Sequence, residues 1–124
     1  MVWERGVVIK TAEEIEIMRA AGRINALALE TVRQMIRPGI TTAALDAAAE
    51  QVIRDHHAVP TFMGYPGPYP YPATLTVSIN DELVHGIPGK RELKEGDIVS
   101  VDCGSTYDGF IADSAFSAGV GEIT

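Results

Sequence analysis

A chain of 124 residues builds one hydrophobic core, so we expect a single domain spanning residues 1–124. Its 17 acidic and 10 basic residues give a formal net charge of −7, which disfavours nucleic-acid phosphates as a partner. One cysteine allows no internal disulfide, and no apolar run resembles a signal peptide or membrane span, so we expect a cytoplasmic protein without a membrane partner.

A long helix is predicted near the start of the chain. Thr11 and Glu14 have the spacing of a capping box, in which each side chain bonds the other residue's backbone N–H. The helical pattern continues until Pro38 and Gly39 end it. This helix is expected to bury a stripe on one face, made of Ile15, Met18, Gly22, Ala26, Leu29 and Ile36.

A second helix is predicted immediately after the first. Either Thr41 or Thr42 can cap its amino terminus. Leu45 begins a narrow stripe of small apolar residues that would face the core, which places Asp46 on the side that faces water.

Strands are predicted from the middle of the chain onward. The proline-rich stretch PTFMGYPGPYPYP excludes helix and central strand, so residues 60–72 are expected to form a loop. ATLTVSIN alternates apolar and polar residues, which is typical of a half-buried strand. IVSVDCGS and GFIADSAF flank a Tyr-Asp-Gly turn and predict a hairpin. The expected fold class is α/β (α+β), with two helices packed on a mostly antiparallel sheet.

Two carboxylates occur on the predicted hairpin. With Asp108 and Gly109 at the centre of a type I′ turn, Gly104 pairs with Asp113. Asp102 then lies diagonal to Asp113 on the same face, about 7–8 Å away, which is close enough for both carboxylates to bind one or two cations. Without a cation, the two acids would raise each other's pKa. The alternative is a water-exposed face on which both acids only add solubility.

Several motifs, taken in order, resemble one metallopeptidase family. SINDELVHGIP, LKEGDIVSVDCG and DGFIADSA follow one another as in the N-terminal half of type I methionine aminopeptidases. The resemblance extends from EIEIMRAAGRI through LDAAAEQVI to GVG, and so covers nearly the whole chain. It implies one half of the pita-bread fold, without the second half. It also implies metal-dependent removal of N-terminal methionine from proteins and peptides.

The resemblance implies roles for individual residues. Asp102 and Asp113 match the aspartates that hold the family's two divalent metal ions, for which cobalt, manganese, iron and zinc are all compatible. His85 matches a catalytic histidine beside the metals. The sequence pattern alone instead indicates a polar residue that caps a turn. Three aromatic residues match the pocket for the methionine side chain: Phe62, Tyr65 and Tyr71. Tyr69 is an alternative to Tyr71, and the alternative role of all three residues is packing in the core or the loop.

Cys103 suggests a rival site, because a cysteine with a histidine and an aspartate can form a nucleophilic centre. Neighbouring residues of a strand point to opposite faces, so Cys103 is expected on the side away from Asp102, as a buried and inert thiol. His56 and His57 follow the second helix and are expected to be surface or helix-end histidines.

The resemblance leaves the metal site incomplete. In the family, a histidine and two glutamates of the second half also bind the metals, and another histidine stabilises the transition state. Two carboxylates alone would bind a cation weakly, so we expect the chain to be inactive alone and active with a complementary second-half chain. The alternative is a self-associating half-fold, a structural or metal-binding homodimer in which the aspartates of both copies meet. A partner-binding scaffold is a third reading, which the metal aspartates disfavour.

Overall fold

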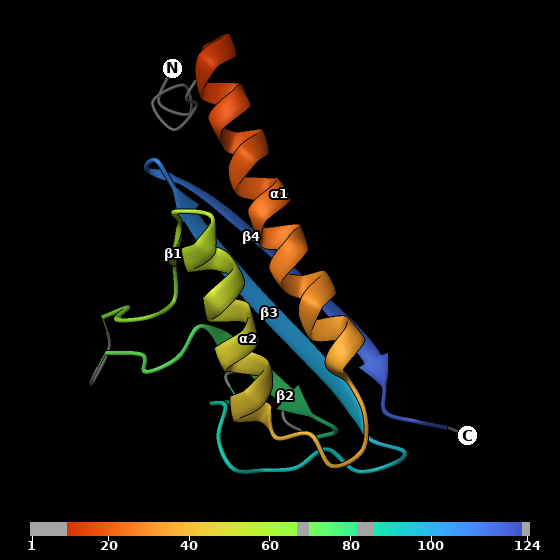
Figure 1. Cartoon of the computed structure of the whole chain (residues 1–124). Helices are drawn as coiled ribbons and strands as arrows, with labels where there is room; N and C mark the ends of the chain where they lie inside the picture. Colours follow the sequence, from red (N-terminus) through yellow and green to blue (C-terminus); the bar gives the residue numbers. More distant parts are fainter. Residues whose placement is uncertain (1–9, 67–69, 82–85, 123–124) are drawn as a thin grey trace, which may run out of the picture.

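The computed structural model of the chain describes residues 10–66, 70–81 and 86–122. Its elements, in chain order, are α1 (Ala12–Met35), α2 (Thr42–Asp55), β1 (Val59–Pro60), β2 (Leu75–Ile79), β3 (Ile98–Tyr107) and β4 (Phe110–Gly119). β3 is central and pairs with β1 and β2 along one edge and with β4 along the other, always antiparallel. Both helices cover the same face of the sheet (Figure 1). The expected architecture is confirmed.

Both helices begin at the predicted caps. The Thr11 hydroxyl accepts the Glu14 N–H at 3.1 Å, and the Glu14 carboxylate accepts the Thr11 N–H at 2.9 Å, which confirms the capping box. Of the two candidates for the second cap, Thr41 is the one used, since its hydroxyl accepts the Ala44 N–H. In the part of the chain that the structure describes, no helix is long and apolar enough to cross a membrane.

The buried stripe of α1 differs from the predicted one. Ile15 and Met18 keep 40% and 39% of their surface exposed, and Ala26 is exposed as well. The face that packs on the sheet and on α2 instead consists of Ala21, Ile24, Asn25, Ala28, Leu29 and Val32. Leu29 of the predicted stripe is buried and Ile36 packs against the core, but the rest of the stripe was assigned to the wrong side of the helix. The buried face also includes a polar residue, Asn25, that bonds to the sheet.

The sheet has two different faces. Val99, Val101 and Cys103 of β3 are fully buried beneath the helices, and the apolar residues of β2 pack beside them. The opposite face carries small and polar residues, and the Ser100 and Ser117 hydroxyls bond across it at 2.7 Å. No helix covers this second face within the described ranges. We refer to it as the open face.

Asp46 of α2 does not face water as the sequence pattern predicted. Its Oδ1 atom accepts the backbone N–H groups of Thr74 and Leu75 at 2.9 and 2.8 Å, where the chain enters β2. Burial raises the pKa of Asp46, and the two hydrogen bonds oppose that rise. Asp46 therefore ties the end of the tyrosine-containing loop to α2.

Candidate metal centre

The β3–β4 hairpin has the predicted register. Asp108 and Gly109 adopt φ values of 49° and 84°, as the two central residues of a type I′ turn require. Gly104 is paired with Asp113, while Asp102 is paired with Ala115. Asp102 and Asp113 are therefore diagonal neighbours on the open face, because side chains of directly paired residues share a face.

Asp102 occupies an electrostatically unfavourable position. Its Oδ1 atom is buried and has no hydrogen-bond partner among the described residues. Burial, followed by the neighbouring Asp113 carboxyl, raises the pKa of Asp102 to about 6, although a hydrogen bond from the Cys103 backbone to the carboxylate opposes that rise. An unsatisfied carboxylate oxygen beside a second acid is costly unless a positive group compensates it. The pair is therefore not simply a water-exposed, solubilising one, because a buried carboxylate oxygen lies beside a second acid.

Phe62 packs against the open face next to the two acids. A Cβ atom added to Gly104 would lie 3.0 Å from Phe62 Cε1 and 3.1 Å from Thr61 Cβ. A side chain at residue 104 would therefore crowd the loop, which approaches the strand closely at this point. Since Gly104 is paired with Asp113, the Phe62 ring lies close to the carboxylates, where the predicted aromatic pocket would have to be.

The two tyrosines of the predicted pocket are held close together by their backbones. The Tyr71 N–H donates to the Tyr65 carbonyl at 3.1 Å, and the Gly64 N–H donates to the Tyr71 carbonyl at 2.8 Å. The Tyr65 side chain is 67% exposed, whereas the Tyr71 hydroxyl donates to the Leu75 carbonyl at 2.7 Å. Burial, followed by the charge of Asp46, raises the pKa of Tyr71 to about 12. Tyr69, the alternative to Tyr71, lies outside the described residues.

Asn25 supports the hairpin from the helix side, which the sequence pattern did not predict. It is 1% exposed, and its Nδ2 donates to the Cys103 carbonyl at 3.1 Å and to Ser114 Oγ at 2.8 Å. Its Oδ1 accepts the Ser105 hydroxyl at 2.7 Å. Cys103 and Ser114 directly follow the two acids in the chain, so Asn25 fixes the backbone of both strands behind the acids. The sequence signal that could have indicated this role is the position of the Asn25 amide on the same helix face as the apolar residues Ile24 and Ala28.

Cys103 lies on the helix face and is fully buried, as predicted. Burial, followed by the charges of Asp102 and Asp113, raises the pKa of its thiol to about 12. A thiol that stays protonated at neutral pH is a poor nucleophile. The structure therefore disfavours the rival cysteine site.

His85 lies outside the described residues, so its predicted place beside the acids stays a prediction. The residue that follows it, Gly86, is buried and accepts the Val77 N–H through its carbonyl at 2.8 Å. His56 caps the carboxyl end of α2 and His57 is exposed at a φ of 63°, so both are helix-end residues, as expected.

The side chains present fit a divalent cation only in part. Carboxylate oxygens are suitable ligands for hard and borderline divalent metals, and Asp102 offers one that has no other partner among the described residues. Within the same ranges, however, no group of three or more His, Cys, Asp or Glu side chains gathers in one place. Two carboxylates leave most coordination positions to water or to groups from elsewhere.

Comparisons with known proteins found relatives that match nearly the whole of this chain. Residues 16–124 match the profile of metallopeptidase family M24. The methionine aminopeptidase of Clostridium perfringens is 46% identical over 118 residues, and methionine aminopeptidase 1 of Bacillus subtilis is 48% identical over the same number. Each alignment covers 95% of this chain and 46% of the relative. The chain thus spans about half the length of the curated relatives it matches.

Solved structures show the same likeness in three dimensions. The crystal structure of methionine aminopeptidase from Thermotoga maritima superposes with a TM-score of 0.89 at 42% identity, over 95% of this chain and 47% of that one. Prolidase from Pyrococcus furiosus gives a TM-score of 0.81 at 25% identity, over 99% of this chain and 34% of that one. The sequence of this chain is therefore more similar to that of the methionine aminopeptidase than to that of the prolidase. The fold is half of a pita-bread fold, and the chain belongs to metallopeptidase family M24.

Proposed function

We propose that this chain is the N-terminal half of a methionine aminopeptidase and supplies part of a site for two divalent cations. The observation that carries the proposal is the buried Oδ1 atom of Asp102, which lacks a partner among the described residues and lies beside Asp113. Residues 1–124 would form one leaf of the fold, and a second leaf would cover the open face. The expected cytoplasmic location stays a prediction.

The proposed roles follow from the resemblance to methionine aminopeptidases, and the diagonal placement of Asp102 and Asp113 on the open face supports them. Asp102 and Asp113 would hold the cations through their carboxylate oxygens. His85 would contact the terminal amine or the scissile amide of the substrate. When bound, cobalt, manganese, iron or zinc would lower the pKa of a water molecule and polarise the scissile carbonyl.

The substrate would be a peptide or protein that begins with methionine. An unbranched thioether fills an apolar aromatic pocket well, and contacts between sulfur and aromatic rings add to the binding. Phe62 already lies against the open face beside the acids, and the backbones of Tyr65 and Tyr71 are bonded to each other. These three residues would therefore form the wall of the pocket that receives the methionine side chain.

Metal binding can be measured on the chain itself. Titration with Mn²⁺, followed by electron paramagnetic resonance of the free ion, should show weak binding that Asp102→Asn and Asp113→Asn each abolish. Asp108→Asn is the matched control, since it removes a carboxylate from the same hairpin and asparagine tolerates the φ of 49° there. Equal loss of binding in all three variants, or in none, would contradict the proposed site.

Activity requires a separate experiment. We expect no hydrolysis of a Met-Gly peptide by the chain alone, because two carboxylates do not complete the site. Addition of the C-terminal half of the Bacillus subtilis relative, made as a separate polypeptide, should restore hydrolysis, which Asp102→Asn should abolish and Asp108→Asn should retain. Turnover by the pure chain alone, lost in Asp102→Ala, would show that a second half is unnecessary.

A homodimer is the second candidate. Ile111 lies on the open face and is 61% exposed, so that face combines apolar surface with two carboxylates. In a symmetric dimer the aspartates of both copies would meet and could hold a cation without peptidase activity. Light scattering on a sizing column, with and without Mn²⁺, should then show a dimer whose formation depends on the metal. A monomer under both conditions would exclude this candidate.

A further inference from the structure

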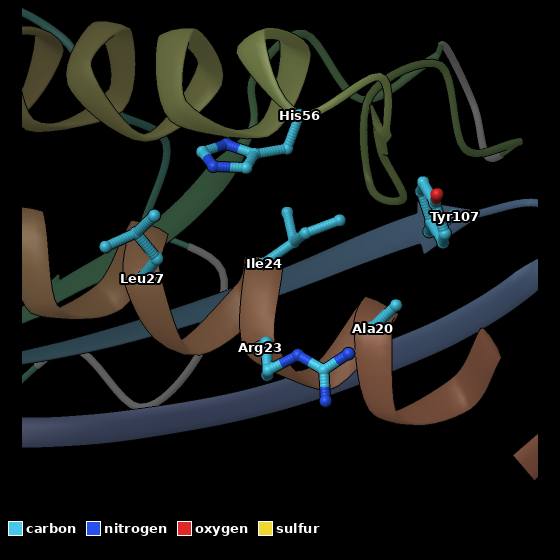
Figure 2. Close-up of a pocket in the computed structure, with 6 residues that line it drawn as sticks. All are labelled: Ala20, Arg23, Ile24, Leu27, His56 and Tyr107. Atoms are coloured by element: carbon cyan, nitrogen blue, oxygen red, sulfur yellow. The ribbon is translucent and has the colours of Figure 1, made fainter. Parts of the chain in front are cut away.

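A hollow on the helix side of the molecule lies away from the candidate metal centre. It has a volume of about 250 Å³ and lies between α1, the end of α2 and the end of β3 (Figure 2). Its lining residues are Ala20, Arg23, Ile24, Leu27, His56 and Tyr107. The floor is aliphatic, and three polar side chains surround it. Small-molecule sites typically combine an apolar surface with a few converging polar groups in this way.

Arg23 brings a positive charge to the hollow. The helical arginines Arg19, Arg33 and Arg54 each pair with a glutamate one turn away. Arg23 forms no such pair among the described residues, and the residues three and four positions from it on both sides include no acid. Although the whole chain carries a net charge of −7, charges more than about 8–10 Å away are largely screened at physiological ionic strength. Asp55 and Asp108 adjoin the lining residues His56 and Tyr107 in the chain, so the attraction of the hollow for an anion comes from Arg23 itself.

His56 adds a hydrogen-bond acceptor. Its Nδ1 lies 2.8 Å from the Val52 carbonyl oxygen. A carbonyl can only accept, so Nδ1 carries the proton and Nε2 of the neutral ring is left as an acceptor. The imidazole projects from the end of α2 toward α1, while Tyr107 borders the hollow from β3 (Figure 2). A ligand that satisfies this site needs both a negative group and a hydrogen-bond donor.

We propose that this hollow binds a small carboxylate that carries an N–H or O–H donor and a short apolar chain. The carboxylate would pair with Arg23, the donor would bond to His56 Nε2, and the apolar chain would lie on Ile24 and Leu27. An acylated apolar amino acid has all three features and fits the volume. The proposal is independent of the aminopeptidase proposal, because such a ligand has no free amine and no scissile N-terminal residue.

The test is a titration of the chain with N-acetyl-L-leucine, followed by two-dimensional NMR. The resonances of Ala20, Leu27 and His56 should shift in a saturable way, with a dissociation constant of about 1 mM, as expected for a ligand of about a dozen heavy atoms. N-acetyl-L-leucinamide, which keeps the donor and the apolar chain but lacks the carboxylate, should bind about tenfold more weakly. This comparison uses the unaltered protein and does not depend on how any variant folds.

Two variants separate the two parts of the recognition. Arg23→Gln should weaken binding of the acid about tenfold and leave binding of the amide unchanged, while Ala20→Phe should fill the hollow and abolish both. Arg37→Gln, the same change at an exposed arginine outside the hollow, is the matched control and should alter neither. Equal affinity for the acid and the amide, shifts that persist in Ala20→Phe, or no saturable shift up to about 20 mM would each overturn the proposal.

Discussion

Replacing Asn25 by alanine should weaken the attachment of the β3–β4 hairpin to α1. The substitution removes three hydrogen bonds at a residue that is 1% exposed, and it leaves the fully buried Ser105 hydroxyl without its acceptor. A buried group left unpaired costs about 1–3 kcal/mol, and the space left by the amide adds about 1 kcal/mol. We therefore expect a loss of about 2–4 kcal/mol in the free energy of unfolding, or about 10 °C in Tm.

Urea unfolding followed by circular dichroism measures this loss. Gln34→Ala removes an amide from the same helix at an exposed position, and it should change the free energy of unfolding by less than about 0.5 kcal/mol. A double-mutant cycle of Asn25→Ala with Ser105→Ala should give a coupling of about 1 kcal/mol. Strict additivity, or an Asn25→Ala protein as stable as the Gln34→Ala control, would refute the role assigned to Asn25.

Three further predictions concern the loop and the residues around it. Gly104→Ala would place a Cβ atom 3.0 Å from Phe62 Cε1, so it should push the loop outward and cost about 1–3 kcal/mol, seen as a lower Tm; an unchanged Tm would show that the loop moves freely. Tyr71→Phe should lose the bond to the Leu75 carbonyl and about 0.5–1.5 kcal/mol, and a negligible loss in urea unfolding would contradict this. Because burial raises the pKa of Asp46, the folded state keeps that proton longer than the unfolded state as the pH rises from about 4. Stability should therefore fall over that range, and a pH series of Tm values should show a smaller fall in Asp46→Asn.

The features predicted correctly from the sequence are those fixed by neighbouring residues. The capping box at Thr11 involves atoms three residues apart, so its pattern is complete within four letters. A two-residue turn at Asp108 and Gly109 determines the pairing of the whole hairpin. The diagonal relation of Asp102 and Asp113 therefore follows from the amino-acid sequence, by counting outward from the turn.

The features that could not be predicted depend on contacts between distant segments. Asp46 looks like a water-facing helix residue until Thr74 and Leu75, some 28 residues later, present their N–H groups to it. Asn25 likewise bonds to residues 78 and 80 positions away. Neither interaction has a local signature, because hydrophobic periodicity ranks a polar residue as exposed whether or not the fold supplies a buried partner.

The helix-covered face of the sheet holds the core of this leaf, whereas the open face would bind a second leaf. If a second leaf covers the open face, Ile111 should contribute to its association and little to the stability of this leaf, since it is 61% exposed here. Ile111→Ser should therefore leave the Tm within about 2 °C of the unaltered chain but weaken activation by the second half. Ile15→Ser, the same change at a helix position that is 40% exposed, should not affect activation. The concentration of second half that gives half-maximal hydrolysis measures the difference, and equal values for both variants would mean that the partner does not bind the open face at Ile111.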